Sequence, residues 1–325
     1  MKRNSDRLAA VVLASLFVVG CARNGDTVAP EPLIPDTPDG TVLAVARHLA
    51  DHDPAILWEA LPESYRSDIN ELTRTFAAKM DPELYDRSMA LVRRAVEVLQ
   101  DKQAIILGSS IVTSTGVDVD EVGRSMTGGL AAAHALMSSE ITTLQGLGAV
   151  DWPQFLSTTG AQLLTLADSS AEKTADDAGA TDSSLASLRD VTVEVVSSEG
   201  DAAVLRVTAP GKAPEDVEMT RVEGRWVPAE MAAEWTEKVA EAKARLEELT
   251  PEKIAELKPQ AMFGLAMAEA FVEQVAAIQT SEEFDATVGP MLQSLMNSFN
   301  SVPPPAPEDE EPPAVGDDGE PPAVS

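Results

Sequence analysis

Apolar residues recur every three to four positions over much of the chain, which is the spacing of one face of an α-helix. These stretches lie on both sides of a central segment in which the period changes to two. The helical stretches carry Ile69, Leu72, Phe76 and Met80; Leu84, Leu91, Ala95 and Val98; Met231, Trp235, Val239, Ala242 and Leu246; and Phe284, Val288, Leu292 and Leu295. The pattern predicts a chain that is helical before and after the central segment.

The central segment alternates apolar and polar residues, which is typical of strands with one buried face. Its four short runs are separated by turns, of which Glu223-Gly224 is the last. The runs are marked by Val191, Val193 and Val195, by Ala203, Leu205 and Val207, by Val217 and Met219, and by Trp226 and Val227. We therefore expect an α+β fold that is predominantly helical, with a small antiparallel β-meander near residues 190–228 flanked by helices.

Capping residues and prolines indicate where several helices begin. Asp53-Pro54, Asp81-Pro82 and Thr250-Pro251 each pair an N-cap side chain with a proline at the first helical position. Pro259 lies inside the stretch that Thr250 opens, and since proline removes a backbone donor we expect the helix to restart there.

Asp118, Asp120 and Glu121 precede a Gly- and Ala-rich stretch at residues 118–138. Carboxylates are favourable at a helix N-terminus, so we expect them to open a helix. The alternative is a calcium loop, but the segment lacks the central glycine and the distal glutamate of an EF-hand.

The charge of the chain excludes one class of partner. It has 325 residues, of which 54 are acidic and 24 basic, and its formal net charge is −30. Phosphates would be repelled, because binding to nucleic acid depends on basic side chains that replace counterions. We therefore expect no nucleic acid partner.

The first 21 residues are typical of a secretory signal. Three basic residues lie within the first seven positions, and the apolar run at 8–19 is too short for a membrane span of about 20 residues. The run leads into Val18-Val19-Gly20-Cys21, which contains the only cysteine of the chain. This segment resembles the lipobox of bacterial lipoproteins.

The lipobox resemblance implies that signal peptidase II cleaves between Gly20 and Cys21. It also implies that Cys21 carries a diacylglyceryl group and a fatty acid such as palmitate, with no other cofactor expected. Two or more acyl chains hold a protein stably on a membrane. Ala22 follows the cysteine, which resembles an outer-membrane sorting signal. We expect a protein anchored by lipid in the bacterial cell envelope, facing the periplasm or the exterior, and at the outer rather than the inner membrane.

Composition and period divide the chain into six segments. The two ends are proline-rich without an apolar period, so we expect them to bury little surface and to be dispensable for folding. The segments are a signal peptide at 1–20, a lipidated and proline-rich tether at 21–40, a helical region at 41–168, a polar linker at 169–187, a β-meander followed by helices at 188–300, and a disordered acidic tail at 301–325.

The strand segment carries a second resemblance. Residues 190–228 end in a hairpin with Gly224-Arg225-Trp226. This segment resembles the sheet of small NTF2-like or cystatin-like domains, whose last hairpin often has a Gly-x-Trp turn. In such domains long helices usually precede the sheet, whereas in this chain helical patterns also follow it.

Two histidines are the sharpest candidates for chemistry. His48 and His52 are four residues apart, and on a helix that spacing would place both on one face, where they could bind zinc. Leu49 stands where a metalloprotease motif has glutamate. The alternative is a pair of polar residues at the end of a helix. The four tryptophans could line a ligand pocket, but with so few aromatics we expect them to be core anchors.

The sequence does not decide whether the protein is an enzyme. It has no nucleophile motif, and its only cysteine is assigned to lipid, which favours a non-catalytic role. The leading hypothesis is a lipid-anchored envelope protein that binds or scaffolds a ligand, with the membrane and another envelope protein as partners. The alternatives are a metal-dependent envelope hydrolase using His48 and His52, and a solute-binding lipoprotein.

Overall fold

The structure is a computed structural model in which residues 33–178 and 185–300 are described, except for the side chains of 170–178 and 292–300. Helices make up most of it. The α-helices are α2 (Pro38–Ala50), α3 (Ala55–Ala60), α4 (Glu63–Lys79), α5 (Pro82–Asp101), α6 (Gln103–Leu107), α7 (Ser110–Thr113), α8 (Val119–Met137), α9 (Leu144–Gly148), α10 (Trp152–Phe155), α11 (Ala161–Ala178), α12 (Ala229–Glu247), α13 (Pro251–Ala277) and α14 (Ser281–Asn300). Shorter turns are the 3₁₀ segments η1 (Glu140–Thr142) and η3 (Leu185–Asp190) and the π-helical turn η2 (Leu156–Gly160). The strands are β1 (Thr192–Glu199), β2 (Ala202–Thr208), β3 (Glu215–Val222) and β4 (Arg225–Pro228).

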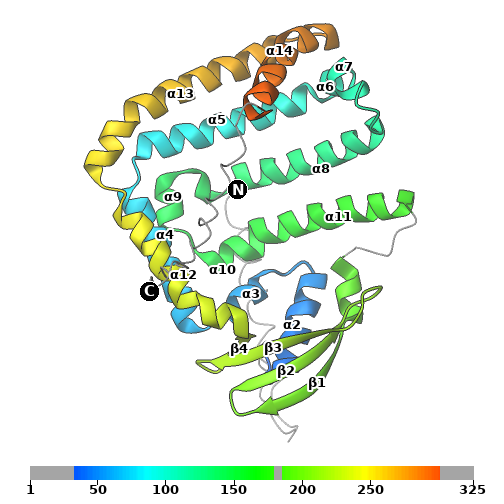
Figure 1. Ribbon diagram of the computed structural model, residues 1–325, viewed down its shortest axis with the longest axis vertical. Coiled ribbons are helices and arrows are strands. Elements are labelled where there is room, and N and C mark those ends of the chain that lie inside the picture. Colours follow the sequence, from blue (N-terminus) through cyan, green and yellow to red (C-terminus); the bar gives the residue numbers. More distant parts are fainter. Residues whose placement is uncertain (1–32, 179–184, 301–325) are drawn as a thin grey trace, which may run out of the picture.

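The long helices form a layer that ends at the sheet. Helices α13, α5, α8 and α11 lie side by side in that order, and each contacts the next (Figure 1). Helices α2 and α3 lie between α11 and the sheet, while α4 and α12 run together along one side of the layer. The helices that precede the sheet in sequence therefore pack against those that follow it.

The predicted antiparallel meander is confirmed. The strand order is β1-β2-β3-β4, and Ala203 of β2 faces Met219 of β3. Leu205 is fully buried among Ala203, Met219 and Trp226, and Val42 of α2 packs against this cluster. The alternating apolar residues thus form one face of the sheet, which α2 covers, as the predicted fold class requires.

The predicted helix starts are confirmed at three positions. The Asp81 carboxylate accepts a hydrogen bond from the backbone N–H of Leu84 at 2.9 Å, and the Thr250 hydroxyl accepts one from Lys253. Asp118 accepts hydrogen bonds from the first turn of α8, as a helix cap and not as part of a calcium loop. The expected restart at Pro259 is wrong, because α13 continues through it to Ala277. The cap expected at Asp53 is also wrong, because α3 begins at Ala55 and its N-cap is Pro54, which makes no side-chain cap hydrogen bond.

The tether predicted at residues 21–40 ends earlier in the structure than the sequence indicates. Helix α2 already begins at Pro38, and Thr37 caps it by accepting a hydrogen bond from Gly40. Ile34 is 5% exposed and packs with Ala44 of α2 and with Ile56. Residues 33–40 therefore belong to the fold, so the predicted tether boundary at residue 40 is wrong, and we expect the removal of these residues to cost stability.

The expected linker at 169–187 is also wrong over most of its length. Helix α11 runs on to Ala178, and residues 185–187 belong to η3. Alanine, glutamate and lysine are good helix formers, so this polar stretch continues the helix although it lacks an apolar period. Residues 179–184, the signal peptide at 1–20, Cys21 and the tail at 301–325 lie outside the described residues.

Aromatic and ionic contacts join the helices from the two halves of the chain. Trp235 of α12 stacks on Tyr65 of α4 with ring centroids 3.9 Å apart, and its indole N–H donates to Asp68 at 3.0 Å. Arg87 of α5 donates two hydrogen bonds of 2.6 Å to Glu269 of α13. Such bidentate pairs fix geometry as well as charge, so these contacts set the positions of α12 and α13.

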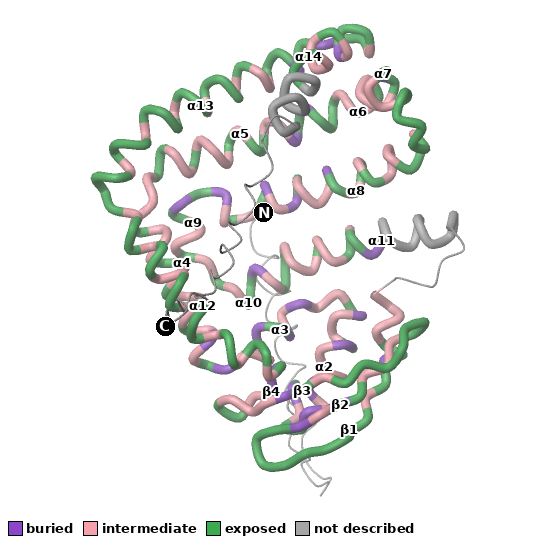
Figure 2. The backbone as a smooth tube through the Cα atoms, in the orientation of Figure 1, coloured by how far each residue is buried: buried purple, intermediate pink, exposed green. Residues whose placement is uncertain are grey.

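Much of the helical layer is exposed, as Figure 2 shows along α13. Helix α13 packs one side on α5 and leaves large apolar side chains on the other. Phe263 is 69% exposed and Met267, one turn later, is 60% exposed. The helix is therefore apolar on its buried side and also on part of its exposed side.

Candidate functional site

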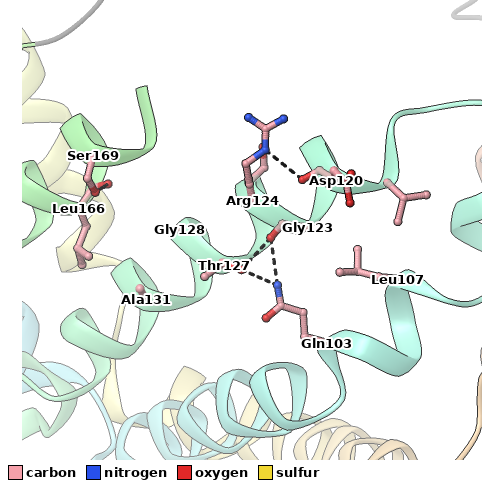
Figure 3. Close-up of a pocket in the computed structure, with 12 residues that line it drawn as sticks. Gln103, Leu107, Asp120, Gly123, Arg124, Thr127, Gly128, Ala131, Leu166 and Ser169 are labelled. Carbon is pink, nitrogen blue, oxygen red and sulfur yellow. Dashed lines mark hydrogen bonds between the residues drawn. The ribbon is translucent and has the colours of Figure 1, made fainter. Parts of the chain in front are cut away.

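A cavity of about 660 Å³ lies where α6, α8 and α11 meet (Figure 3). Its volume falls within the range of about 300–1,000 Å³ that is usual for ligand sites. The described residues that line it are Gln103, Leu107, Val119, Asp120, Gly123, Arg124, Ser125, Thr127, Gly128, Ala131, Leu166 and Ser169. Most of them belong to α8, which therefore forms the main wall, with α11 opposite. We call this the α8–α11 cavity.

Small residues on α8 leave space for the cavity. Gly123, Thr127 and Ala131 follow one another at four-residue steps, so they lie along one face of the helix. A Cβ atom at Gly123 would lie 3.1 Å from the Leu107 side chain. The Gly- and Ala-rich composition of the helix therefore has a structural effect, because larger residues on this face would fill the cavity or push α6 away.

One amide fixes α6 against α8. Gln103 Nε2 donates to the carbonyl oxygen of Gly123 at 3.0 Å and to the Thr127 hydroxyl at 2.6 Å (Figure 3). The Thr127 hydroxyl in turn donates to the Gly123 carbonyl at 2.8 Å. This network holds the cavity wall in one arrangement, so the shape of the site is set before a ligand enters.

The lining combines apolar, hydroxyl and charged groups. Besides two glycines, the lining residues carry four aliphatic side chains, three hydroxyls, one amide, one carboxylate and one guanidinium. Within the described lining, no hydrogen bond joins a hydroxyl to a carboxylate or to a histidine. The arrangement can therefore hold a small ligand by apolar contact and hydrogen bonds.

The geometry expected for His48 and His52 is wrong. Helix α2 ends at Ala50, and His52 follows it with φ 56°, so the two rings do not share a helix face. His48 Nδ1 lies 2.8 Å from Asp53 Oδ2, and His52 Nε2 lies 3.0 Å from Asp168 Oδ2. Each imidazole thus has its own carboxylate partner. Among the described side chains, those of residues 33–169 and 185–291, no group of three or more His, Cys, Asp or Glu is placed to hold a metal ion.

Asp168, the partner of His52, is not among the residues that the sequence pattern singles out. Its side chain is 8% exposed and also accepts a hydrogen bond of 2.6 Å from the backbone N–H of Leu185. His52 and Asp168 are 116 positions apart, so no local pattern could pair them. This carboxylate joins the end of α2, the helix α11 and the start of η3, which is a structural role.

Two of the four tryptophans, Trp58 and Trp226, are buried, and the other two, Trp152 and Trp235, are half-buried. Trp58 and Trp226 are 8% and 6% exposed, which confirms the expectation of core anchors for these two. Trp152 is half-buried and stacks on Trp58 with ring centroids 6.3 Å apart. None of the four is among the described residues that line the α8–α11 cavity.

Comparison with known proteins returns no match to a family model, to a characterised protein or to a solved structure. The lipobox resemblance and the resemblance of residues 190–228 to NTF2-like or cystatin-like domains therefore stay predictions. Within the part of the chain that the structure describes, no helix has both the length and the apolar character needed to span a membrane.

Proposed function

We propose that this protein is a lipid-anchored protein of the bacterial cell envelope that binds a small molecule in the α8–α11 cavity without transforming it. The observation that carries the proposal is the cavity itself, about 660 Å³ in volume, with a mixed apolar and hydroxyl lining. A site of this kind recognises shape and a few polar groups. The solute-binding alternative uses the same cavity and therefore falls within this proposal. The alternative of a metal-dependent hydrolase gains no support, because His48 and His52 contact different carboxylates and do not lie together.

The anchor follows from the lipobox at Val18-Val19-Gly20-Cys21. Acyl chains on Cys21 would hold the folded region at an envelope membrane, with the outer membrane favoured by Ala22. An acidic protein gains no attraction from anionic headgroups, so the lipid would provide the attachment. Another envelope protein remains the proposed macromolecular partner.

Metabolic labelling with an alkyne fatty acid is expected to mark the wild-type protein and not Cys21→Ser, because Cys21 is the only thiol in the chain. The measurement is in-gel fluorescence of the purified protein after conjugation of a dye to the alkyne. Equal labelling of the two proteins would contradict the anchor.

Filling the cavity is expected to abolish ligand retention. Ala131→Trp places a large side chain in the space between α8 and α11, whereas Ala255→Trp makes the same change on the exposed surface of α13. Native mass spectrometry of each protein, purified from envelope in mild detergent, would measure the bound small molecule. We expect the ligand on the wild type and on Ala255→Trp only. An equal amount on Ala131→Trp, or none on the wild type, would contradict the proposal.

A further inference from the structure

A second concavity, of about 570 Å³, lies on the side of the molecule where α12 packs on α4. Its floor consists of half-buried apolar side chains from four helices. They are Leu72 and Phe76 of α4, Leu147 of α9, Trp152 of α10, and Ala242 and Leu246 of α12. We call this the α4–α12 groove. Because all six side chains keep part of their surface exposed, a ligand in the groove would remove additional apolar area from water.

Charged groups of α12 form the rim of the groove. Lys238, Glu241 and Arg245 line it and are exposed. Their spacing of three and four residues puts them on one side of the helix. Lys238 and Arg245 are two turns apart, which is about 10 Å along the axis. The rim therefore has two cations and one anion.

The two rim cations have no protein partner in the described structure, neither a hydrogen bond nor an ion pair. Lys243, on the same helix, differs from them. Its ammonium donates to Glu71 at 2.9 Å and lies 3.7 Å from Asp68, and this hydrogen bond with Glu71 raises the pKa of Lys243. In a chain with net charge −30, carboxylates are plentiful, yet none within the described residues pairs with Lys238 or Arg245.

We propose that the α4–α12 groove binds a single-chain amphiphile with one negative charge, of the fatty acid class, with its chain on the apolar floor and its headgroup beside Lys238 and Arg245. The apolar floor matches a hydrocarbon chain. The rim carries one net positive charge, which matches a monoanionic headgroup, and charge-assisted hydrogen bonds to a carboxylate are the stronger kind. A hydrocarbon with a cationic head would instead be repelled. This inference goes beyond the proposed function, because the groove shares no lining residue with the α8–α11 cavity.

The test is isothermal titration calorimetry with sodium dodecanoate below its micelle concentration, on the chain from Ala22 onward. This chain lacks the apolar run at 8–19 and the proposed lipid site at Cys21, so it needs no detergent. We expect one dodecanoate per protein. Dodecyltrimethylammonium, which has the same chain and the opposite charge, is expected to bind at least about tenfold more weakly, because it cannot accept hydrogen bonds from Lys238 and Arg245. Equal affinity for the two amphiphiles, or no binding of dodecanoate, would overturn the proposal.

Two pairs of variants locate the binding. Lys238→Gln with Arg245→Gln should weaken dodecanoate at least about tenfold. Lys212→Gln with Arg225→Gln removes the same charge at the sheet, away from the groove, and should change the affinity by less than about twofold. All four side chains are at least partly exposed, so both proteins should fold, as circular dichroism melting would verify. If the two double variants bound dodecanoate with the same affinity, whether strong or weak, the assignment to this groove would be overturned.

A groove-filling variant checks the floor independently of charge. Ala242→Trp should abolish dodecanoate binding, because Ala242 lies on the apolar floor. The matched change Ala255→Trp, at an exposed position of α13, should leave it intact. Unchanged binding to Ala242→Trp would show that the hydrocarbon chain lies elsewhere and would overturn the proposal.

Discussion

Replacing Leu205 by alanine is expected to lower the free energy of unfolding by about 2–5 kcal/mol, as large-to-small changes in a core do. Leu205 has 0% exposure and lies in the cluster that includes Met219 and Trp226, against which Val42 of α2 also packs. The change leaves a space that the paired strands cannot close, because their hydrogen bonds fix their spacing. Urea denaturation followed by circular dichroism would measure the loss.

Val196→Ala is the control for this experiment, since Val196 lies in the same sheet and is 47% exposed. We expect a change within about 0.5 kcal/mol, as for other surface substitutions. A loss below 1 kcal/mol for Leu205→Ala, or the same loss for both variants, would contradict the placement of the sheet core.

Ile34→Ala is expected to cost about 2–5 kcal/mol, although the residue lies in a proline-rich stretch without any periodic pattern. Ile34 is 5% exposed and packs with Ala44 and Ile56, whereas its neighbour Leu33 is 65% exposed. Leu33→Ala should therefore change the unfolding free energy by less than about 0.5 kcal/mol. The two variants remove aliphatic side chains of equal size at adjacent positions, so only burial distinguishes them.

Urea denaturation of both variants would decide between two descriptions of this segment. Equal and small effects would restore the longer tether that the sequence predicts. A large loss for Ile34→Ala alone would place the folded boundary before residue 34.

Local signals in the sequence predicted much of the secondary structure. The alternation around Val193 and Leu205 predicted the strands because every second residue of a strand faces the same side. Asp81-Pro82 predicted the start of α5 because an N-cap side chain and a proline both act within one turn. These signals depend on neighbours in sequence, so they could be interpreted without knowledge of the fold.

The misplaced boundaries have a common cause. The segments at 33–40 and 169–178 have compositions typical of loops, but the first buries Ile34 and the second continues α11. Pro259 lies within α13 although proline disfavours a helix interior by about 3 kcal/mol. Packing on other elements, such as α5 for α13, compensates for unfavourable local preferences, and the sequence does not reveal which elements will pack together.

By itself, the sequence determined the fold class, the meander and several helix starts, and it gave the basis for predicting a lipid anchor at Cys21. Only the tertiary structure decided which side chains face the two concavities. It also separated His48 from His52 and joined His52 to Asp168, which is 116 positions away. The physical reason is that each of these arrangements depends on contacts between helices distant in sequence, such as α8 with α11 and α4 with α12, whose packing no local pattern specifies.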